Sequence, residues 1–213
     1  MESLDRHTDY GQTALDESHL SSDPIAQLAE WLVEAEQAGV YEPNAFVLGT
    51  IDAGGKPTAR TVLLKGVSAE GFFFATNYLS RKGQALALNP AVTMVFGWYS
   101  QHRQVVVEGH AHQVPAAESD AYFASRPRDS QIATAASAQS QPIQDRAALE
   151  AEFEQTAARF LAGEVPRPEH WGGYRIVPTR IEFWKGRSNR LHDRIVFERA
   201  SADQPWQVTR LQP

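Results

Sequence analysis

The chain has 213 residues, of which 42% are hydrophobic and 10% aromatic, enough to bury one sizeable core in a single domain with appendages. A formal net charge of -6 argues against a nucleic-acid partner, because general nucleic-acid binders usually carry a broad basic surface. The absence of cysteine excludes disulfides, a thiolate nucleophile and a zinc-thiolate site, so redox chemistry would need a bound cofactor. Neither a membrane-spanning apolar run nor a basic-then-apolar leader is evident, and we expect a cytoplasmic protein with no membrane partner.

The N-terminal region predicts an arm followed by a helix. Residues 1–22 are polar and lack a period, which is typical of a mobile arm, and residues 23–213 are expected to form one domain. Asp23 and Pro24 are typical of a helix start, apolar residues follow at helical spacing, and Gly39 ends the helix.

The middle of the chain is mainly β. Apolar stretches bounded by turns predict strands at 45–51, 58–67, 72–76, 92–98 and 104–114. Short strands joined by tight turns favour an antiparallel sheet or small barrel over alternating βαβ units. Helices are expected at 116–125 and 145–161, before a proline-rich link to the final strands.

Two basic segments suggest an anionic ligand. Ser80 is a good N-cap for a helix whose first turn then carries Arg81 and Lys82, an unfavourable place for cations unless an anion binds there. On the predicted strand before it, Arg60 and Lys65 fall on opposite faces unless a bulge realigns them, so two neighbouring anions would fit. An exposed helix start and a buried strand with polar ends are the plainer interpretations.

A third basic segment joins two helices. Tyr122 and Arg126 are one helical turn apart, and Pro127 breaks or restarts the helix, which leaves Arg126 and Ser130 free to converge on a ligand. A phenol, a guanidinium and a hydroxyl suit a phosphate, although a capping arrangement between the helices would use the same residues.

The C-terminal region predicts a β-hairpin from segments 181–184 and 190–197. Alternation along the second strand places Arg190, His192 and Arg194 on one face, where like charges are unfavourable unless water or an anion compensates them. A solvated edge strand is the plain alternative. No metal site is expected, because paired imidazoles on a strand without a third ligand are typical of a solvated face.

Taken together, these motifs resemble the pyridoxine (pyridoxamine) 5'-phosphate oxidase family from about residue 23 to the C-terminus. The matching segments are Arg-Thr-Val-Leu-Leu-Lys at 60–65, Thr-Asn-x-x-Ser-Arg-Lys at 76–82, Arg-Gln at 103–104, Ser-Arg-Pro-Arg-Asp-Ser-Gln-Ile at 125–132, Gln-Ser at 139–140, Trp-Gly-Gly at 171–173, Ile-Glu-Phe-Trp at 181–184 and Arg-Leu-His-Asp-Arg at 190–194. The resemblance implies a mainly β (α+β) fold, an FMN-binding split β-barrel with flanking helices and a C-terminal dimerisation hairpin. It also implies a homodimer with FMN at the subunit interface.

The resemblance also implies roles for individual residues. FMN would be held by Arg60, Val62, Leu63, Lys65, Ala75, Thr76, Arg81, Lys82, Gln104, Gln139, Ser140, Trp184 and Arg194. The substrate phosphate would be held by Lys65, Tyr122, Arg126 and Ser130. Arg190 and His192 would act on the pyridine ring of the substrate as the catalytic pair.

The implied reaction is the oxidation of pyridoxamine 5'-phosphate or pyridoxine 5'-phosphate to pyridoxal 5'-phosphate, in vitamin B6 biosynthesis and salvage. A hydride equivalent would pass from substrate C4' to flavin N5, and O2 would reoxidise the flavin and yield H2O2. One alternative is a related FMN-dependent oxidase of another aromatic substrate, of the phenazine type, which would lack the substrate-phosphate residues. Another is a flavin-binding or vitamer-binding protein without turnover.

The N-terminal arm departs from the family pattern. Studied members place an arginine three residues before a tyrosine that closes over the substrate, whereas here His7 stands three residues before Tyr10 and Arg6 is one position further away. We expect Tyr10 to contact substrate, and a disordered tail is the alternative.

Overall fold

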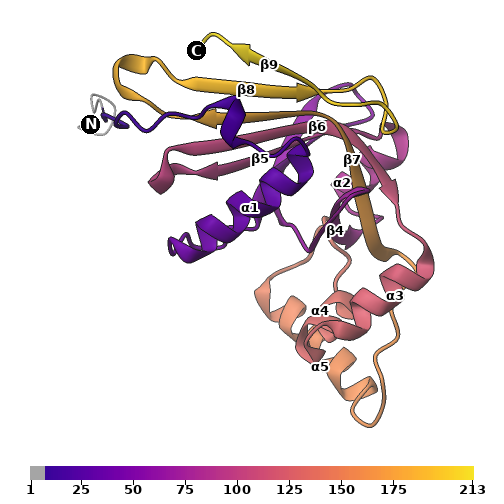
Figure 1. Cartoon of the computed structure of the whole chain (residues 1–213). Coiled ribbons are helices and arrows are strands. Elements are labelled where there is room, and N and C mark those ends of the chain that lie inside the picture. Colours follow the sequence, from indigo (N-terminus) through magenta and orange to yellow (C-terminus); the bar gives the residue numbers. More distant parts are fainter. Residues whose placement is uncertain (1–7) are drawn as a thin grey trace.

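The structure is a computed structural model that describes residues 8–213 (Figure 1). Arg6 and His7 therefore lie outside the described residues. Helix α1 (Pro24–Gln37) begins as the sequence predicts, because the Asp23 carboxylate accepts a hydrogen bond from the Ile25 N–H and Pro24 occupies the first helical position. The helix packs on the sheet through Trp31, whose ring lies edge-on to Phe183 at a centroid distance of 5.1 Å.

The body of the molecule is one curled antiparallel sheet. Its strands are β1 (Ala45–Ile51), β2 (Pro57–Leu63), β3 (Gly66–Ser68), β4 (Gly71–Asn77), β5 (Ala91–Trp98), β6 (Arg103–Gln113), β7 (Trp171–Lys185), β8 (Asp193–Glu198) and β9 (Gln207–Leu211). Seven of them follow the order β2-β1-β5-β6-β7-β4-β3, and β8 and β9 continue from β7. This arrangement confirms the predicted mainly β fold.

Strand β7 is where the sheet divides. One edge of β7 pairs with β6 over nearly its whole length. The other edge pairs first with β4, from Trp171 to Ile176, and then with β8, from Arg180 to Lys185. A 15-residue strand with two successive partners sends one part of the sheet toward the helices and the other toward the C-terminal hairpin (Figure 1).

The strand predicted at 58–67 is wrong as a single element. The chain changes partner between Leu64, whose N–H donates to the Asn44 carbonyl beside β1, and Lys65, whose N–H donates to the Phe73 carbonyl on β4. The break joins β2 to β3, the two ends of the strand order, and so links the edges of the curled sheet. It also removes the strict alternation that separated Arg60 from Lys65.

The remaining helices are α2 (Arg81–Leu88), α3 (Ala116–Ser125), α4 (Arg128–Ala136) and α5 (Arg146–Arg159), with short 3-10 turns at Glu17–His19, Tyr99–Gln101 and Ser188–Arg190. Pro127 separates α3 from α4, so the predicted restart of the helix is confirmed. Helices α3, α4 and α5 group at one end of the molecule, away from β8 and β9 (Figure 1). None of the described helices is both long and apolar enough to cross a bilayer.

The C-terminal hairpin forms, but its second strand begins later than predicted. Asn189 and Arg190 adopt positive φ values of 58° and 60° and curl the chain into a 3-10 turn, and pairing with β7 begins at Asp193. Arg190 and His192 therefore precede the strand, and the predicted face shared by Arg190, His192 and Arg194 is wrong. Strand β9 was not predicted, because its five residues are mostly polar and exposed.

The described part of the predicted arm, residues 8–22, lies against the C-terminal hairpin. Leu15 is buried, and its N–H donates to the Asp193 carboxylate over 2.9 Å. The mobility of the arm stays a prediction.

The main core lies between the two halves of the curled sheet and under α1. Its fully buried large side chains are Phe46, Phe72, Phe74, Phe96, Phe183, Phe197, Leu28, Leu48, Met94, Ile176, Ile181 and Ile195. A smaller cluster of Phe123, Ile132, Val165 and Trp171 joins the α3–α5 group to the start of β7. The space between these two clusters contains the candidate site.

Candidate functional site

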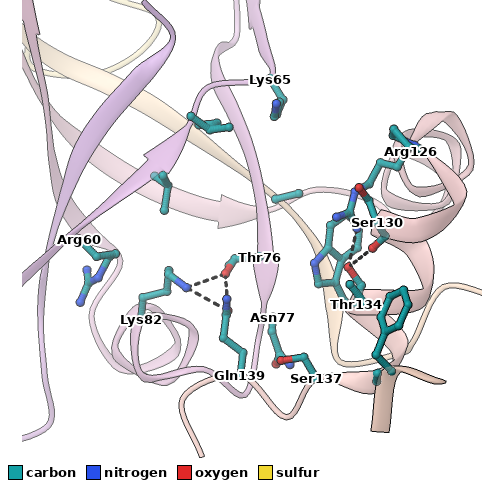
Figure 2. A pocket seen from close by; sticks show the side chains of 18 of the residues that line it. Arg60, Lys65, Thr76, Asn77, Lys82, Arg126, Ser130, Thr134, Ser137 and Gln139 are labelled. Atoms are coloured by element: carbon teal, nitrogen blue, oxygen red, sulfur yellow. Dashed lines mark hydrogen bonds between the residues drawn. The ribbon is translucent and has the colours of Figure 1, made fainter. Parts of the chain in front are cut away.

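A cavity of about 1070 Å³ opens between β2, β4, the first turn of α2 and the helices α3–α5. The predicted site residues that line it are Arg60, Val62, Leu63, Lys65, Ala75, Thr76, Lys82, Tyr122, Arg126, Ser130 and Gln139. The structure thus brings together three basic segments that are far apart in the sequence. Figure 2 shows the lining side chains in two groups, with Arg60 and Lys82 on one side and Arg126 and Ser130 on the other.

The first group is built from β2 and the start of α2. The Arg60 guanidinium donates to the Leu48 carbonyl over 3.0 Å and to the Thr50 and Thr58 hydroxyls over 2.8 and 2.7 Å. These neutral acceptors hold the side chain in place without neutralising it. Burial, followed by repulsion from nearby Arg81, lowers the pKa of Arg60.

Lys82 stands in the first turn of α2, as predicted. The Ser80 hydroxyl caps this turn by accepting from the Gly83 N–H, and a Cβ at Gly83 would collide with the Tyr78 carbonyl oxygen. Lys82 points inward, and its Nζ donates to Thr76 Oγ1 and Gln139 Oε1, each over 3.0 Å (Figure 2). The start of α2 is therefore shaped to present a cation to the cavity.

The buried ammonium of Lys82 is suited to an anionic ligand. Its side chain is buried and its hydrogen-bond partners are neutral. Burial, with repulsion from Arg60, lowers the pKa of Lys82 to about 8. A bound anion would favour the charged ammonium and raise this pKa.

The second group comes from α3 and α4. Arg126 lies over the Trp171 ring, with its guanidinium carbon 4.7 Å from the ring centroid, and donates to Thr134 Oγ1 over 2.6 Å. Thr134 in turn donates to the Ser130 carbonyl over 2.9 Å. Burial lowers the pKa of Arg126 and raises that of Tyr122, which also lines the cavity.

Four of the cations that line the cavity have no carboxylate partner among the described residues. Within residues 8–213, no ion pair involves Arg60, Lys65, Lys82 or Arg126. The one acidic residue among the described lining residues is Glu150, and it pairs with Arg146, whose side chain is 81% exposed. Lys82 is buried, Arg60 and Arg126 are half-buried, and Lys65 is exposed. Cations that lose solvent are usually paired, so this arrangement fits one or two anionic groups.

The lining of the cavity suits the ring system of FMN in addition to its phosphate. Besides its cationic groups, the lining includes the apolar side chains of Val62, Leu63 and Ala75. Binding sites for flat organic cofactors typically combine such apolar walls with a few fixed polar groups. Arg60 and Lys82 could hold the FMN phosphate at one end, and Arg126 with Ser130 could hold a second phosphate at the other.

Other predicted site residues lie outside this cavity. Gln104, Ser140, Trp184, Arg190, His192, Arg194 and Tyr10 are not among its lining residues. Arg81 points outward, with 64% of its side chain exposed, and forms an ion pair with Asp52 over 3.3 Å. Ser140 is exposed and has a positive φ of 74°.

Most of these residues gather around the β7–β8 hairpin. Gln104 pairs with Trp184 across β6 and β7, and the Trp184 ring lies 4.8 Å from the His192 ring. The Arg187 N–H donates to His192 Nδ1 over 3.1 Å, which ties His192 back to the turn. Arg194 forms an ion pair with Glu182 over 2.7 Å. A single chain therefore contains two separate groups of predicted site residues.

Sequence reasoning missed two lining residues beside Arg126. Thr134 lies one helical turn after Ser130, and this i,i+4 spacing is a signal that was available. Trp171 belongs to the quoted Trp-Gly-Gly motif, and its contact with Arg126 depends on tertiary packing. Both residues hold the Arg126 guanidinium.

Comparison with known proteins assigns the chain to a family. Residues 32–160 match the sequence model described as pyridoxamine 5'-phosphate oxidase, and residues 171–213 match the pyridoxine 5'-phosphate oxidase C-terminal dimerisation region. The pyridoxine/pyridoxamine 5'-phosphate oxidase of Janthinobacterium sp. (strain Marseille) is 48% identical, and the match covers 100% of both chains.

Two solved structures share the fold. PhzG from Burkholderia lata 383, in complex with tetrahydrophenazine-1-carboxylic acid, has a TM-score of 0.89 at 32% identity and covers 96% of this chain and 100% of its own. A pyridoxamine 5'-phosphate oxidase-related, FMN-binding protein from Nostoc punctiforme has a TM-score of 0.73 at 13% identity, covering 91% of this chain and 100% of its own. The predicted split-barrel fold is confirmed, and the chain belongs to the pyridoxamine 5'-phosphate oxidase family.

Proposed function

We propose that the protein is an FMN-dependent oxidase that converts pyridoxamine 5'-phosphate or pyridoxine 5'-phosphate to pyridoxal 5'-phosphate, with O2 as electron acceptor and H2O2 as co-product. One observation carries this proposal. A single cavity has Arg60 and Lys82 on one side and Arg126 on the other, and Lys65 also lines it (Figure 2). None of these cations is in an ion pair among the described residues, which suits one phosphate on the cofactor and another on the substrate.

Bound FMN would supply the two-electron oxidising chemistry that the side chains of this chain lack. Arg60 and Lys82 bind the FMN phosphate, and Thr76 and Gln139 orient the Lys82 ammonium. Val62, Leu63 and Ala75 exclude water beside the ring system. Gln104, Trp184 and Arg194 come from the second chain of a homodimer and complete the cofactor site.

The substrate phosphate binds Lys65, Tyr122, Arg126 and Ser130. This contact fixes the vitamer at one end, so that the carbon to be oxidised is held in place before reaction. Arg190 and His192 reach the pyridine ring from the partner chain, where Arg190 clamps the ring and His192 hydrogen-bonds its substituents. The matched dimerisation region, which includes both residues, supports a site built from two chains.

The structural likeness to PhzG makes a phenazine-type oxidase the second candidate. A ligand such as the tetrahydrophenazine-1-carboxylic acid in that complex carries a carboxylate and no phosphate. The presence of Arg126, Ser130 and Lys65 in the lining of one cavity favours the phosphorylated vitamer. A binding protein without turnover would make the same contacts, so only an activity assay distinguishes it from the oxidase.

The experiment compares substrates with the purified protein. We expect a yellow protein that converts pyridoxamine 5'-phosphate and pyridoxine 5'-phosphate to pyridoxal 5'-phosphate, with one H2O2 formed and one O2 consumed per product, and with ammonia released from the amine alone. Faster oxidation of a reduced phenazine carboxylate than of either vitamer would support the second candidate. A yellow protein that oxidises none of these compounds would support the binding protein.

A further inference from the structure

A buried carboxylate joins the N-terminal arm to the C-terminal strands. The Asp193 side chain is 8% exposed and accepts hydrogen bonds from the Leu15 N–H over 2.9 Å and from Arg210 Nη1 over 2.6 Å. Arg187 approaches the same carboxylate to 3.6 Å. Asp193 follows His192 directly in the chain, so the residue that receives the arm is covalently next to a proposed substrate residue.

Arg210, on β9, contacts the arm in two further ways. Its guanidinium donates to the Leu15 carbonyl over 2.9 Å and to the Glu17 carboxylate oxygens over 2.8 and 2.7 Å. The Glu17 contact, then the Asp193 contact, raises the pKa of Arg210. One guanidinium thus connects the backbone and side chain of the arm to the buried Asp193.

These contacts determine where the preceding residues of the arm lie. The Ser188 N–H donates to the Gly11 carbonyl over 2.8 Å, and its hydroxyl donates to the Asp9 carboxylate over 2.6 Å. Tyr10 stands between Asp9 and Gly11 in the chain. The centroid of its ring lies 4.6 Å from that of His102 and 5.7 Å from that of His192. Any side chain at Gly186 would collide with Tyr10, so the ring lies directly on this backbone.

We propose that Glu17, Asp193 and Arg210 are positioning residues that form a latch, which seats the arm so that Tyr10 covers His192. The assignment of His192 to the substrate rests on the proposed function, whereas the latch itself rests on contacts within this chain. Glu17 and Arg210 are 38% and 40% exposed, so their ion pair alone is weak. The strength of the latch comes from Asp193, which is buried and receives both the arm and Arg210.

The latch can be distinguished from a contact that only stabilises the fold by its effects on hydrogen exchange in the arm and on KM. Weakening it should release residues 9–20 locally while the central strands stay closed. It should also raise the KM for the vitamer, because Tyr10 no longer covers the site, and should change kcat little. The effect on KM should disappear in a variant that already lacks the Tyr10 ring, because Arg210 acts through that ring.

The test uses the full chain with FMN and compares Arg210→Met, the milder Glu17→Gln and the control Arg199→Met. Arg199 stacks on Trp206 at 4.1 Å, and its hydrogen bonds go to Pro178 and Ala202, outside the arm. We expect hydrogen exchange at Leu15 to accelerate by about tenfold or more in Arg210→Met and severalfold in Glu17→Gln, with β4 and β7 unchanged. Arg199→Met should leave exchange in the arm unchanged.

The kinetic readout uses pyridoxamine 5'-phosphate. Arg210→Met should raise KM severalfold, and Tyr10→Ala combined with Arg210→Met should match Tyr10→Ala alone. Unchanged exchange at Leu15 in both latch variants would overturn the latch, and faster exchange with an unchanged KM would overturn its role at the substrate site. If Arg210→Met fails to fold, Glu17→Gln decides both readouts. If the wild-type protein oxidises no vitamer, the proposed function fails, and the exchange data still decide whether the arm is latched.

Discussion

Two sets of cationic side chains in this protein have opposite surroundings. In the cavity, Lys82 is buried and Arg126 is half-buried among neutral groups, and both have lowered pKa values. Around the C-terminal hairpin, Arg194 and Arg210 contact the buried carboxylates Glu182 and Asp193, and both arginines have raised pKa values. The hairpin cations therefore have their counter-charges within the chain, whereas the cavity cations are suited to a ligand that brings its own.

Removing a cavity cation should impair function with little effect on folding. In Arg126→Met, we expect kcat/KM for pyridoxamine 5'-phosphate to fall on the order of 10²–10³-fold, because a desolvated charged contact to the substrate phosphate is lost. Arg146→Met is the matched control, since Arg146 lies at the mouth of the cavity with its side chain 81% exposed. Steady-state kinetics check both variants, and equal losses in the two would contradict a specific role for Arg126.

Removing a hairpin counter-charge should impair folding with or without a ligand. Although burial opposes it, hydrogen bonds from Arg194 and Arg180 lower the pKa of Glu182, whose side chain is 8% exposed. Glu182→Gln should therefore reduce the free energy of unfolding by about 2–3 kcal/mol.

The control for this change is Glu108→Gln, because Glu108 also pairs with Arg180 but is 49% exposed. Its effect should stay within about 0.5 kcal/mol. Urea unfolding of both variants measures the difference, and equal stabilities would show that burial of Glu182 adds nothing to its pair.

The pH dependence of FMN binding should report the charge of Lys82. The free protein holds this pKa at about 8, and a bound phosphate raises it. Below pH 8 the Lys82 ammonium is charged in the free protein and in the FMN complex, so its titration does not change the affinity for FMN. Above pH 8 the free protein loses a proton that the complex retains, so the dissociation constant should rise by roughly tenfold per pH unit.

Lys82→Arg provides the control, because arginine stays charged across this range. Fluorescence titrations with FMN between pH 7 and 9.5 should show the rise in the wild-type protein and a flat profile in Lys82→Arg. The same rise in both proteins would assign the titration to another group.

The support of Arg126 by Thr134 should have the smallest effect. In Thr134→Val, the guanidinium loses its 2.6 Å hydrogen bond and the KM for the vitamer should rise by roughly five- to tenfold. Thr134→Ser keeps the hydroxyl and should restore KM to near the wild-type value. A KM in Thr134→Val that matches the wild type would mean that Trp171 alone holds Arg126.

Local signals in the sequence predicted much of the fold. Asp23 with Pro24, and Ser80, mark helix starts that the structure confirms, because capping depends on residues that are adjacent in the chain. The break at Leu64 and Lys65 could not be predicted from neighbouring residues, because it depends on tertiary pairing. At this point the chain stops pairing beside β1 and begins to pair with β4. The residues 186–189 were expected to form the turn, but its continuation through Arg190 was hidden, because the β-branched residues that follow extended the strand pattern.

The cavity was predicted better than the hairpin for a physical reason. Arg60, Lys82 and Arg126 belong to motifs whose basic residues are visible in the sequence, and the family resemblance implied that these motifs meet at one site. The partners of Arg194 and Arg210 are visible only in the folded chain, because Glu182 and Asp193 meet them through strand pairing. A list of basic residues therefore overstates how many lack a counter-charge within the chain.

Calorimetry with two ligands and two variants tests whether the two cationic groups of the cavity bind two different phosphates. Arg60→Met should weaken FMN binding by more than about tenfold, whereas Arg126→Met should leave FMN affinity near that of the wild type. With FMN bound, Arg126→Met should weaken binding of pyridoxal 5'-phosphate by more than about tenfold. If both variants lose FMN equally, or if Arg126→Met binds pyridoxal 5'-phosphate like the wild type, the two cationic groups do not serve two phosphates and the account is contradicted.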